Sequence, residues 1–342
     1  MLENLSTLTN LDGPSGYEKE VSDFLKASFS KYIYAEVDRI GNVIARNEGK
    51  KKPKVLVCAH MDEVGFIVQD IDENGFLKLS PIGGWDERII LGMPVKLLGK
   101  EKVIGVFATT PPHILKGEEA AKPVRIEECF VDTGLSKKEL LEKGIDIGSF
   151  AVPYSKFITN KDLIITKALD DRVGCTYLLE IAKIANSFDY ELVLGASVQE
   201  EVGSRGAKVL ASNVEPDLAI VLECTVAADI PGIEPSRQPT QLRKGAAITI
   251  MDRTMITDKR LFDKALNIAR DEGINYQIKK PAYGGTDAGA IHIAGRGIPS
   301  LVISCPARYI HSAHSITTIF DLEETKKFVI KILEKVDEDF LK

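Results

Sequence analysis

Histidines and carboxylates follow four apolar segments of this sequence, residues 55–59, 192–198, 218–222 and 301–304. Together with an Asp-Asp pair, these candidate residues are His60, Asp62, Asp170, Asp171, Glu200, Glu201, Glu223, His311 and His314. Imidazole and carboxylate ligands without thiolates suit zinc, cobalt or manganese in a catalytic role. The carboxylates are numerous enough for two ions with one bridging residue. Two ions about 3.5 to 4 Å apart can hold a hydroxide beside a reacting carbonyl.

Two short spacings suggest how these side chains divide their roles. His60 and Asp62 are two residues apart, so an extended chain places both on one face, where one can bind a metal ion and the other can orient a ligand. Glu200 and Glu201 are adjacent, so at a strand end they point to different sides, and one can bind a metal ion while the other acts as a general base. Each pattern also has an ordinary explanation, an exposed acidic pair or a lone structural histidine.

The Asp170-Asp171 pair precedes a segment with helical periodicity, residues 172–186. Acidic residues at the N-terminus of a helix are commonly explained by the helix dipole alone. That explanation accounts for one aspartate but not for both beside the other candidate residues. Asp170 and Asp171 therefore remain candidates for the metal site.

The apolar segments that lead to the candidate residues alternate with helical patterns. Strands are predicted at residues 55–59, 191–198, 218–222 and 300–304, with helices between several of them. This alternation predicts an α/β fold with a mostly parallel, twisted sheet and helices on both faces. Ligands bind such open sheets outside the carboxyl ends of the strands, which is where the candidate residues lie.

The pattern changes between about residues 65 and 166. Short strands at residues 66–68, 76–79, 94–98 and 103–107 are separated by Gly and Asn-Gly turns, a spacing typical of a small barrel or sandwich rather than of βαβ units. We therefore predict a catalytic α/β domain made of residues 1–65 and 166–342. Residues 66–165 form an inserted β-rich domain in this prediction.

Composition argues against several classes of protein. The 342 residues carry a net charge of -6 with a pI near 5.6, which disfavours general nucleic-acid binding because phosphate contacts need clustered Lys and Arg. No apolar run approaches the roughly 18 residues of a membrane helix, and residues 1–10 do not resemble a signal peptide. The five cysteines form no CxxC pair, which favours reduced thiols and a cytoplasmic location.

Five motifs appear in order along essentially the whole chain: residues 60–65 (HMDEVG), 168–174 (ALDDRVG), 199–203 (QEEVG), 284–288 (GGTDA) and 308–312 (RYIHS). Together they resemble the motifs of the two-metal aminopeptidases of the glutamyl aminopeptidase and tetrahedral (TET) peptidase family. The resemblance implies a zinc-exopeptidase-like fold with an inserted PDZ-like β-barrel that serves dimerisation. It also implies peptide substrates, release of N-terminal amino acids by a metal-bridging hydroxide, and a homo-oligomer, commonly a tetrahedral dodecamer built from dimers.

The resemblance also implies roles for individual residues. Five of them would bind two divalent metal ions, zinc or cobalt first and manganese as a further option: His60, Asp170, Glu201, Glu223 and His311. Asp170 would bridge both ions, and a cis peptide bond would join it to Asp171. Glu200 would be the base that takes the proton of the attacking water, and Asp62 would hold the surroundings of His60 and of this base.

Two assignments within the resemblance stay open. Many relatives have Asp where this chain has Glu223, and Asp229 is a nearby acid that an alignment can exchange with it. A Glu reaches one methylene further, so it can bind a metal ion through one oxygen or through both. His314 lies close to His311 and is the alternative histidine ligand, although the motif matches His311.

Two other functions compete with that of a metallo-aminopeptidase. Paired carboxylates can act as acid and base in a glycoside hydrolase, and members of the family have sometimes been labelled endoglucanases. His60 and His311 argue against this function, because glycoside hydrolases need no such ligands. A non-catalytic shell component that binds peptides or metal is the other alternative, which retention of the base Glu200 disfavours.

Overall fold

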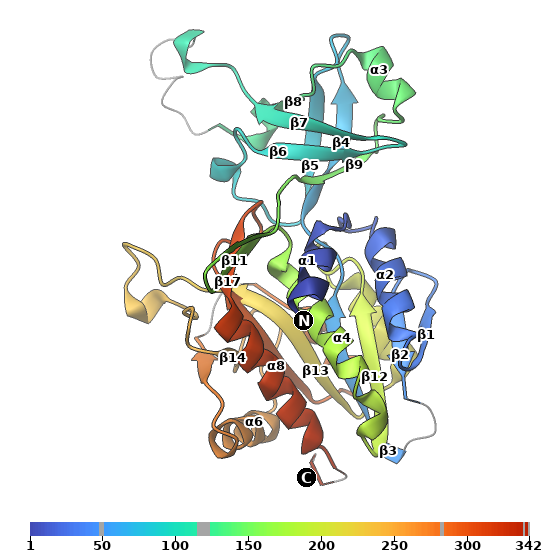
Figure 1. Ribbon diagram of the computed structural model, residues 1–342, viewed down its shortest axis with the longest axis vertical. Coiled ribbons are helices and arrows are strands. Elements are labelled where there is room, and N and C mark those ends of the chain that lie inside the picture. Colours follow the sequence, from blue (N-terminus) through green and yellow to red (C-terminus); the bar gives the residue numbers. More distant parts are fainter. Residues whose placement is uncertain (48–50, 115–123, 281–283, 338, 341–342) are drawn as a thin grey trace.

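The structure is a computed structural model that describes the whole chain except residues 48–50, 115–123, 281–283, 338 and 341–342 (Figure 1). Its main feature is an eight-stranded sheet. In spatial order the strands are β1 (Tyr34–Val37), β2 (Val43–Arg46), β12 (Tyr190–Ser197), β3 (Lys51–His60), β13 (Leu218–Val226), β16 (Ser300–Ala307), β14 (Ala246–Thr249) and β15 (Tyr276–Lys279).

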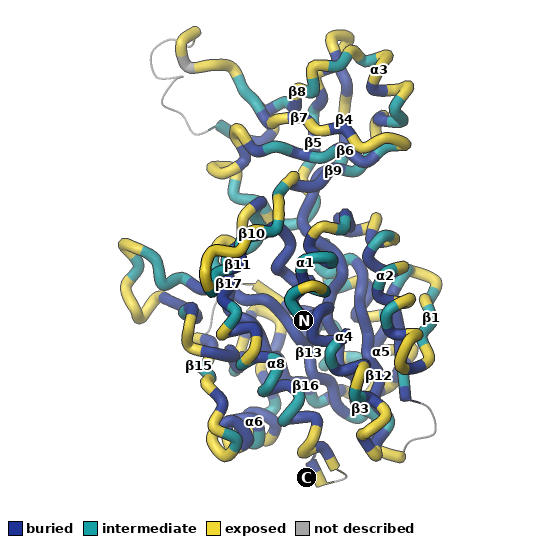
Figure 2. The backbone as a smooth tube through the Cα atoms, viewed as in Figure 1, coloured by how far each residue is buried: buried dark blue, intermediate teal, exposed yellow. Residues whose placement is uncertain are grey.

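The centre of this sheet is parallel. Strands β12, β3, β13 and β16 run in the same direction, whereas β1, β2 and β14 introduce antiparallel pairs nearer the edges. All of β16 is buried, as are residues 55–60 of β3 (Figure 2). Strands that are covered on both faces carry continuous apolar runs rather than alternating patterns, which explains the apolar segments in the sequence.

Helices cover both faces of the sheet. Five helices pack through one large apolar core: α1 (Leu2–Asn10), α2 (Lys19–Phe29), α4 (Leu169–Ala182), α6 (Lys259–Asp271) and α8 (Ile319–Glu334). Two more contribute to a separate core on the other face: α5 (Arg205–Val214) and α7 (Asp287–Ile291). The predicted α/β fold is therefore confirmed, although the sequence patterns do not predict α1. Among the helices of the described residues, none has the length and apolar character needed to cross a membrane.

Six strands between β3 and α4 close into a separate barrel, which confirms the predicted inserted barrel. In spatial order they are β4 (Gly65–Ile71), β5 (Leu77–Ile82), β8 (Phe130–Asp132), β7 (Lys102–Ala108), β6 (Pro94–Leu98) and β9 (Phe150–Pro153). The barrel has its own apolar core, which includes Phe66, Leu97 and Val131. A short helix, α3 (Lys137–Glu142), contributes Leu140 to this core. In Figure 1 the barrel stands apart from the α/β body at one end of the molecule.

Two short strands follow β9 where the chain returns from the barrel, and they form a sheet with a third strand that comes much later in the sequence. The order in this sheet is β10 (Ile158–Asn160), β11 (Leu163–Thr166) and β17 (Ser315–Thr318). The change from barrel to body thus falls between β9 and α4. We keep the division into residues 1–65 with 166–342 and residues 66–165 as a proposal.

A buried ion network joins the barrel to the α/β body. Asp12 is only 1% exposed and accepts hydrogen bonds from two barrel lysines, Lys96 at 2.7 Å and Lys102 at 2.8 Å. On the body side, Lys167 Nζ lies 3.9 Å from Asp12 and 2.5 Å from Glu63. Because Lys167 and Glu63 lie close in sequence to candidate site residues, the network connects the barrel to the backbone of the site.

Candidate metal centre

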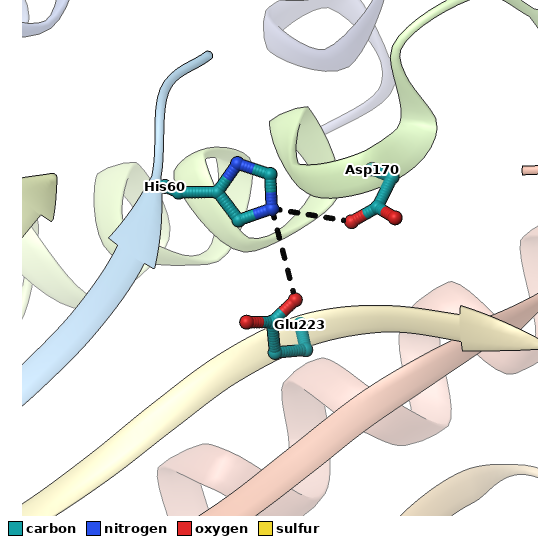
Figure 3. A group of neighbouring side chains, drawn as sticks. All are labelled: His60, Asp170 and Glu223. Atoms are coloured by element: carbon teal, nitrogen blue, oxygen red, sulfur yellow. Dashed lines mark hydrogen bonds and ion pairs between the residues drawn. The ribbon is translucent and has the colours of Figure 1, made fainter. Parts of the chain in front are cut away.

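His60 ends β3 and faces two carboxylates (Figure 3). Its Nε2 lies 3.3 Å from Asp170 Oδ1 and 3.8 Å from Glu223 Oε2. Asp170 lies at the start of α4, where its backbone is not yet helical, and Glu223 comes from the buried strand β13. These three side chains offer ligand atoms within 4.8 Å of one another, so they could hold one metal ion.

A second group forms around the other oxygen of Asp170. His311 Nε2 lies 3.4 Å from Asp170 Oδ2 and 3.1 Å from Glu201 Oε1. Asp170 therefore presents one carboxylate oxygen to His60 and the other to His311. Such an arrangement suits a carboxylate that bridges two metal ions.

The donor set fits divalent metal ions. Glu223 Oε1 is buried and has no hydrogen-bond partner within the described part of the chain, and a carboxylate oxygen in that position is costly without a cation. Burial by itself would lower the pKa of His311, but hydrogen bonds to Asp170 and Glu201 raise it to about 11. The carboxylates therefore attract positive charge, and a metal ion bound there would replace the proton of the histidine.

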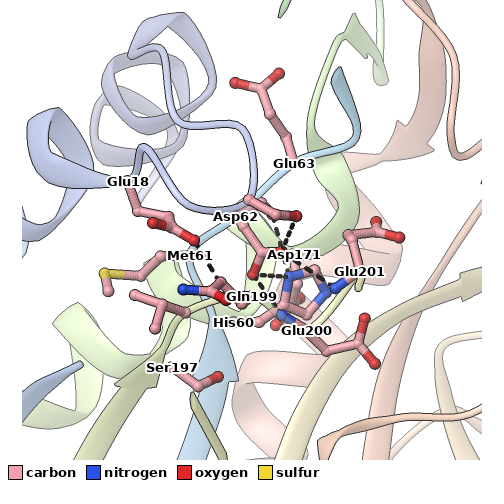
Figure 4. Close-up of polar contacts among 12 residues, drawn as sticks. Glu18, His60, Met61, Asp62, Glu63, Asp171, Ser197, Gln199, Glu200 and Glu201 are labelled. Carbon is pink, nitrogen blue, oxygen red and sulfur yellow. Dashed lines mark hydrogen bonds and ion pairs between the residues drawn. The ribbon is translucent and has the colours of Figure 1, made fainter. Parts of the chain in front are cut away.

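Asp62 organises the loop that carries the two glutamates (Figure 4). Its buried side chain accepts hydrogen bonds from Ser15 Oγ at 2.6 Å and from the backbone N–H groups of Glu200 at 2.9 Å and Glu201 at 3.1 Å. His60 Nδ1 lies 3.5 Å from Asp62 Oδ1. Burial by itself would raise the pKa of Asp62, but the contacts with His60 and Ser15 lower it. Asp62 is therefore placed to orient both His60 and the backbone of the glutamates.

Glu200 and Glu201 diverge after the end of β12. Glu201 reaches His311, whereas Glu200 Oε1 accepts a hydrogen bond from Ser204 Oγ at 3.4 Å. Glu200 also forms a group with His60 and Glu201 whose ligand atoms lie within 4.8 Å of one another. Burial raises the pKa of Glu200 well above its usual value, although His60 opposes this shift. A carboxyl group with a raised pKa is suited to accept a proton near neutral pH.

The peptide bond between Asp170 and Asp171 is cis, as the resemblance implies. Asp171 is fully buried, and its Oδ1 accepts a hydrogen bond from the backbone N–H of Gly174 at 2.9 Å. Asp171 lies outside the groups of described residues that could hold a metal ion. The helix N-terminus explains the hydrogen bond of Asp171 Oδ1, but Oδ2 is buried without a hydrogen-bond partner among the described residues. Asp170, in contrast, is shared by two candidate metal groups.

Asp229 and His314, the alternative ligands, have surroundings that differ from those of the candidate metal centre. Asp229 pairs with Arg308, with 2.6 Å between Oδ2 and Nη2. His314 is exposed and lies outside the candidate metal groups of the described residues. The structure thus brings Glu223 and His311, rather than Asp229 and His314, to the candidate metal centre.

One expectation about the strands is wrong. The sequence predicts that Glu223 follows the end of a strand, but β13 continues beyond it to Val226. The neighbouring strand β16 continues alongside and places Ser304 opposite Glu223. Both strands are stabilised by this additional pairing, so Glu223 projects from within the sheet and not from a loop.

The barrel contributes a contact that the sequence analysis missed. The loop after β5 places Gly84 O 3.0 Å from His311 Nδ1, and a hydrogen bond there directs the other ring nitrogen toward the carboxylates. The next residue, Trp85, donates from Nε1 to Gly65 O at 3.0 Å and stacks on Phe66. The one sequence feature that could have pointed to this loop is the single tryptophan, Trp85, which directly follows two glycines.

A cavity of about 1140 Å³ lies beside the candidate ligands. Its wall combines barrel residues such as Gly84 and Trp85 with His60, Asp170 and Glu223 from the α/β body. Sites for small ligands commonly have volumes of about 300 to 1,000 Å³. The cavity therefore has room for a peptide segment next to the candidate metal centre.

The sequence profile of a family described as M42 glutamyl aminopeptidase matches residues 41–328. The chain belongs to this family. Membership of the M42 family makes the chain a hydrolase of the aminopeptidase class, and it confirms the resemblance seen in the five motifs.

Similar M42 and TET proteins cover nearly the whole chain. It is 33% identical to the glutamyl aminopeptidase of Lactococcus lactis subsp. cremoris (strain MG1363) over 98% of this chain and 97% of that protein. It is 31% identical to the lysyl aminopeptidase of Pyrococcus furiosus, with the same coverage of both chains. The solved TET aminopeptidase of the marine sediment archaeon Thaumarchaeota archaeon SCGC AB-539-E09 has a TM-score of 0.96 at 37% identity, covering 99% of this chain and 97% of that one. The Pyrococcus horikoshii TET1 peptidase has a TM-score of 0.86 at 30% identity, covering 98% and 99%.

Proposed function

We propose that the chain is a di-metal aminopeptidase that releases N-terminal amino acids from peptides. The observation that carries this proposal is the placement of Asp170, whose two oxygens face His60 and His311. One ion would be held by His60, Glu223 and Asp170, and the other by His311, Glu201 and Asp170. Zinc and cobalt suit these ligands, and manganese is also compatible.

The residues around this centre suggest how the reaction proceeds. Divalent ions, when bound, lower the pKa of water and polarise a carbonyl group. Glu200 would accept a proton from the attacking water and deliver it to the leaving amine. Asp62 would keep Glu200 in place through the hydrogen bond from its backbone N–H. Glu200 and Asp62 are therefore the proposed catalytic and positioning residues.

A metal-titrated screen of aminoacyl chromogenic substrates tests the proposed function. The protein is stripped with a chelator, supplied with zinc, cobalt or manganese, and assayed with aminoacyl p-nitroanilides. We expect loss of hydrolysis after chelation, recovery with at least one ion, and two bound ions per chain by elemental analysis. Absence of hydrolysis with every ion would favour a non-catalytic shell component. Chelator-resistant release of sugar from a polysaccharide would favour a glycoside hydrolase.

We propose in addition that the chain forms a homo-oligomer, with a tetrahedral dodecamer built from dimers as the first candidate. The Pyrococcus horikoshii TET1 peptidase is described as assembling into a tetrahedron or a large octahedral shell. Light scattering tests this assembly, because a dodecamer has about twelve times the 37.5 kDa mass of the chain. A monomeric mass at all concentrations would contradict it.

A cytoplasmic location is also proposed. All five cysteines are free and buried, as is common for proteins in a reducing compartment. Fractionation of cells that express the protein at its native level would test this location. Recovery of the protein outside the cytoplasmic fraction would contradict it.

Family membership leaves the preferred N-terminal residue open. Two relatives of nearly equal similarity, at 33% and 31% identity, are named glutamyl and lysyl aminopeptidase. Glutamate and lysine carry opposite charges. The preference must therefore depend on residues that differ among proteins of the same fold.

A further inference from the structure

Part of the cavity wall comes from β15 and from the loops before α6 and α7, which supply none of the candidate metal ligands. The lining residues from these segments are Thr254, Lys279, Gly284, Gly285 and Thr286. Four of them are small and uncharged. Lys279 therefore provides the charge in this part of the wall.

Lys279 is the last residue of β15 and is only 8% exposed. Within the residues that the structure describes, its amine takes part in neither a hydrogen bond nor an ion pair. Lysines are rarely this buried without a partner, because removing an ammonium group from water is costly. A buried amine that lines a cavity is therefore available to an anionic group of a ligand.

Asp252 and the carboxylates of the candidate metal centre have partners other than Lys279. Asp252, in the loop that also carries Thr254, accepts hydrogen bonds from the Thr254 backbone at 2.7 Å and from Thr286 Oγ1 at 3.3 Å. The carboxylates of the candidate metal centre face its two histidines. Neither group forms an ion pair with Lys279, so a carboxylate from a bound ligand could fill this role.

We propose that Lys279 selects the side chain of the substrate's N-terminal residue by binding the carboxylate of Glu or Asp. This inference rests on the proposed aminopeptidase function. When the first peptide carbonyl is at the metal centre, the side chain of that residue occupies the same cavity, whose wall includes Lys279. An ammonium–carboxylate hydrogen bond is stronger than one to a neutral amide. Lys279 thus favours Glu over Gln, which has the same length but no charge.

The Glu and Gln p-nitroanilides form the decisive pair of substrates, with the Leu and Lys compounds as further probes. For the metal-loaded wild-type protein, we expect kcat/KM to favour Glu over Gln by about 10- to 100-fold, the effect of one hydrogen bond to a charged group. Lys279→Met should bring this ratio close to one. Lys280→Met is the matched control and should keep the wild-type ratio, because Lys280 is exposed and donates to the carbonyl of Pro235.

Two outcomes would overturn the role of Lys279: a wild-type Glu-to-Gln ratio near one, or an unchanged ratio in Lys279→Met. Lys279→Gln replaces the Met variant if the latter does not fold, as judged by thermal unfolding. Failure of this inference is distinguishable from failure of the proposed function. Hydrolysis of the Leu substrate without any preference for acidic residues overturns only the selection by Lys279. Absence of hydrolysis of all four substrates overturns the aminopeptidase function itself.

Discussion

The barrel and the candidate metal centre bury different kinds of side chain. The barrel interior is apolar, with Phe66 and Leu97 fully buried among other hydrophobic residues. The candidate metal centre instead buries His60, Asp170 and Glu223, and one oxygen of Glu223 has no hydrogen-bond partner within the residues that the structure describes. Apolar burial stabilises the fold, whereas buried charges are costly until a ligand supplies the missing interactions. This contrast is what we expect of a part of the sheet that binds a ligand at the expense of stability.

Contacts between the barrel and the α/β body form a boundary between the two regions. Gly84 of the barrel contacts His311, and Lys96 and Lys102 of the barrel bind Asp12 of the body. Changes inside the barrel should therefore affect stability alone. Changes at the metal centre should affect chemistry, and changes at the boundary should affect the attachment of the barrel.

Replacing the shared carboxylate should have the largest effect. We expect Asp170→Asn to abolish turnover and to reduce bound metal from two ions to at most one per chain, because an amide is a poorer bridging ligand than a carboxylate. Elemental analysis and p-nitroanilide hydrolysis measure both effects. Asp229→Asn is the matched control, since Asp229 pairs with Arg308, and it should retain both ions. Two ions in the Asp170 variant would refute the bridging role.

Replacing Glu200, the proposed base, should have the next largest effect on activity. Glu200→Gln should lower kcat by about 10²- to 10⁴-fold, the usual contribution of a general acid–base group. Metal content should stay near the wild-type value, because the proposed ligands of both ions are other residues. Comparing kcat with bound metal per chain tests this role. Loss of an ion in the variant would show instead that Glu200 is a ligand.

Much of the candidate metal centre can be predicted from the sequence. His60 ends one strand and Glu201 follows another. The continuous apolar character of both strands is visible in the sequence, and parallel strands bring their carboxyl ends to one edge of a sheet. The motif resemblance adds Asp170 and its cis peptide bond, which the structure also has. The closeness of these side chains in the structure could be predicted because it depends on local patterns and on one general property of α/β sheets.

Other features depend on contacts between distant segments. The carbonyl of Gly84 and the lysine partners of Asp12 follow from how the barrel sits against the body, which no local periodicity encodes. The continuation of β13 past Glu223 depends on pairing with β16, so it is also a tertiary effect. Lys279 reads in the sequence as an ordinary strand residue, and its burial in a cavity wall becomes visible only in the fold.

At the boundary, Asp12→Asn should lower the free energy of unfolding by about 3 kcal/mol, because it leaves Lys96 without its carboxylate partner and removes one of the two carboxylates that face Lys102 and Lys167. Burial by itself would raise the pKa of Asp12, but Lys167, Lys102 and Lys96 lower it. A lowered folded-state pKa gives stability that is present above the unfolded value of 3.8 and is lost as the pH falls through the folded value. The difference between wild type and variant should therefore be largest near neutral pH and shrink below about pH 4.

Urea unfolding of both proteins between pH 3 and 7 measures this difference. Glu101→Gln is the control, since it removes an ion pair with Lys143 that lies at the surface of the barrel, and such pairs contribute little. A difference between wild type and Asp12→Asn that does not change with pH would show that the lysines do not act through the charge of Asp12.

The smallest effect is expected inside the barrel. Ile145 is fully buried in the barrel core, and Ile145→Val removes one methylene group, which should lower the free energy of unfolding by about 1 kcal/mol. At temperatures well below unfolding, kcat and KM should equal the wild-type values, because this core contributes apolar packing and the variant keeps its shape. A change in kcat without a change in folded fraction would show that packing in the barrel alters the position of Gly84 against His311. Packing in the barrel interior would then affect catalysis. This would contradict the expectation that changes inside the barrel affect stability alone.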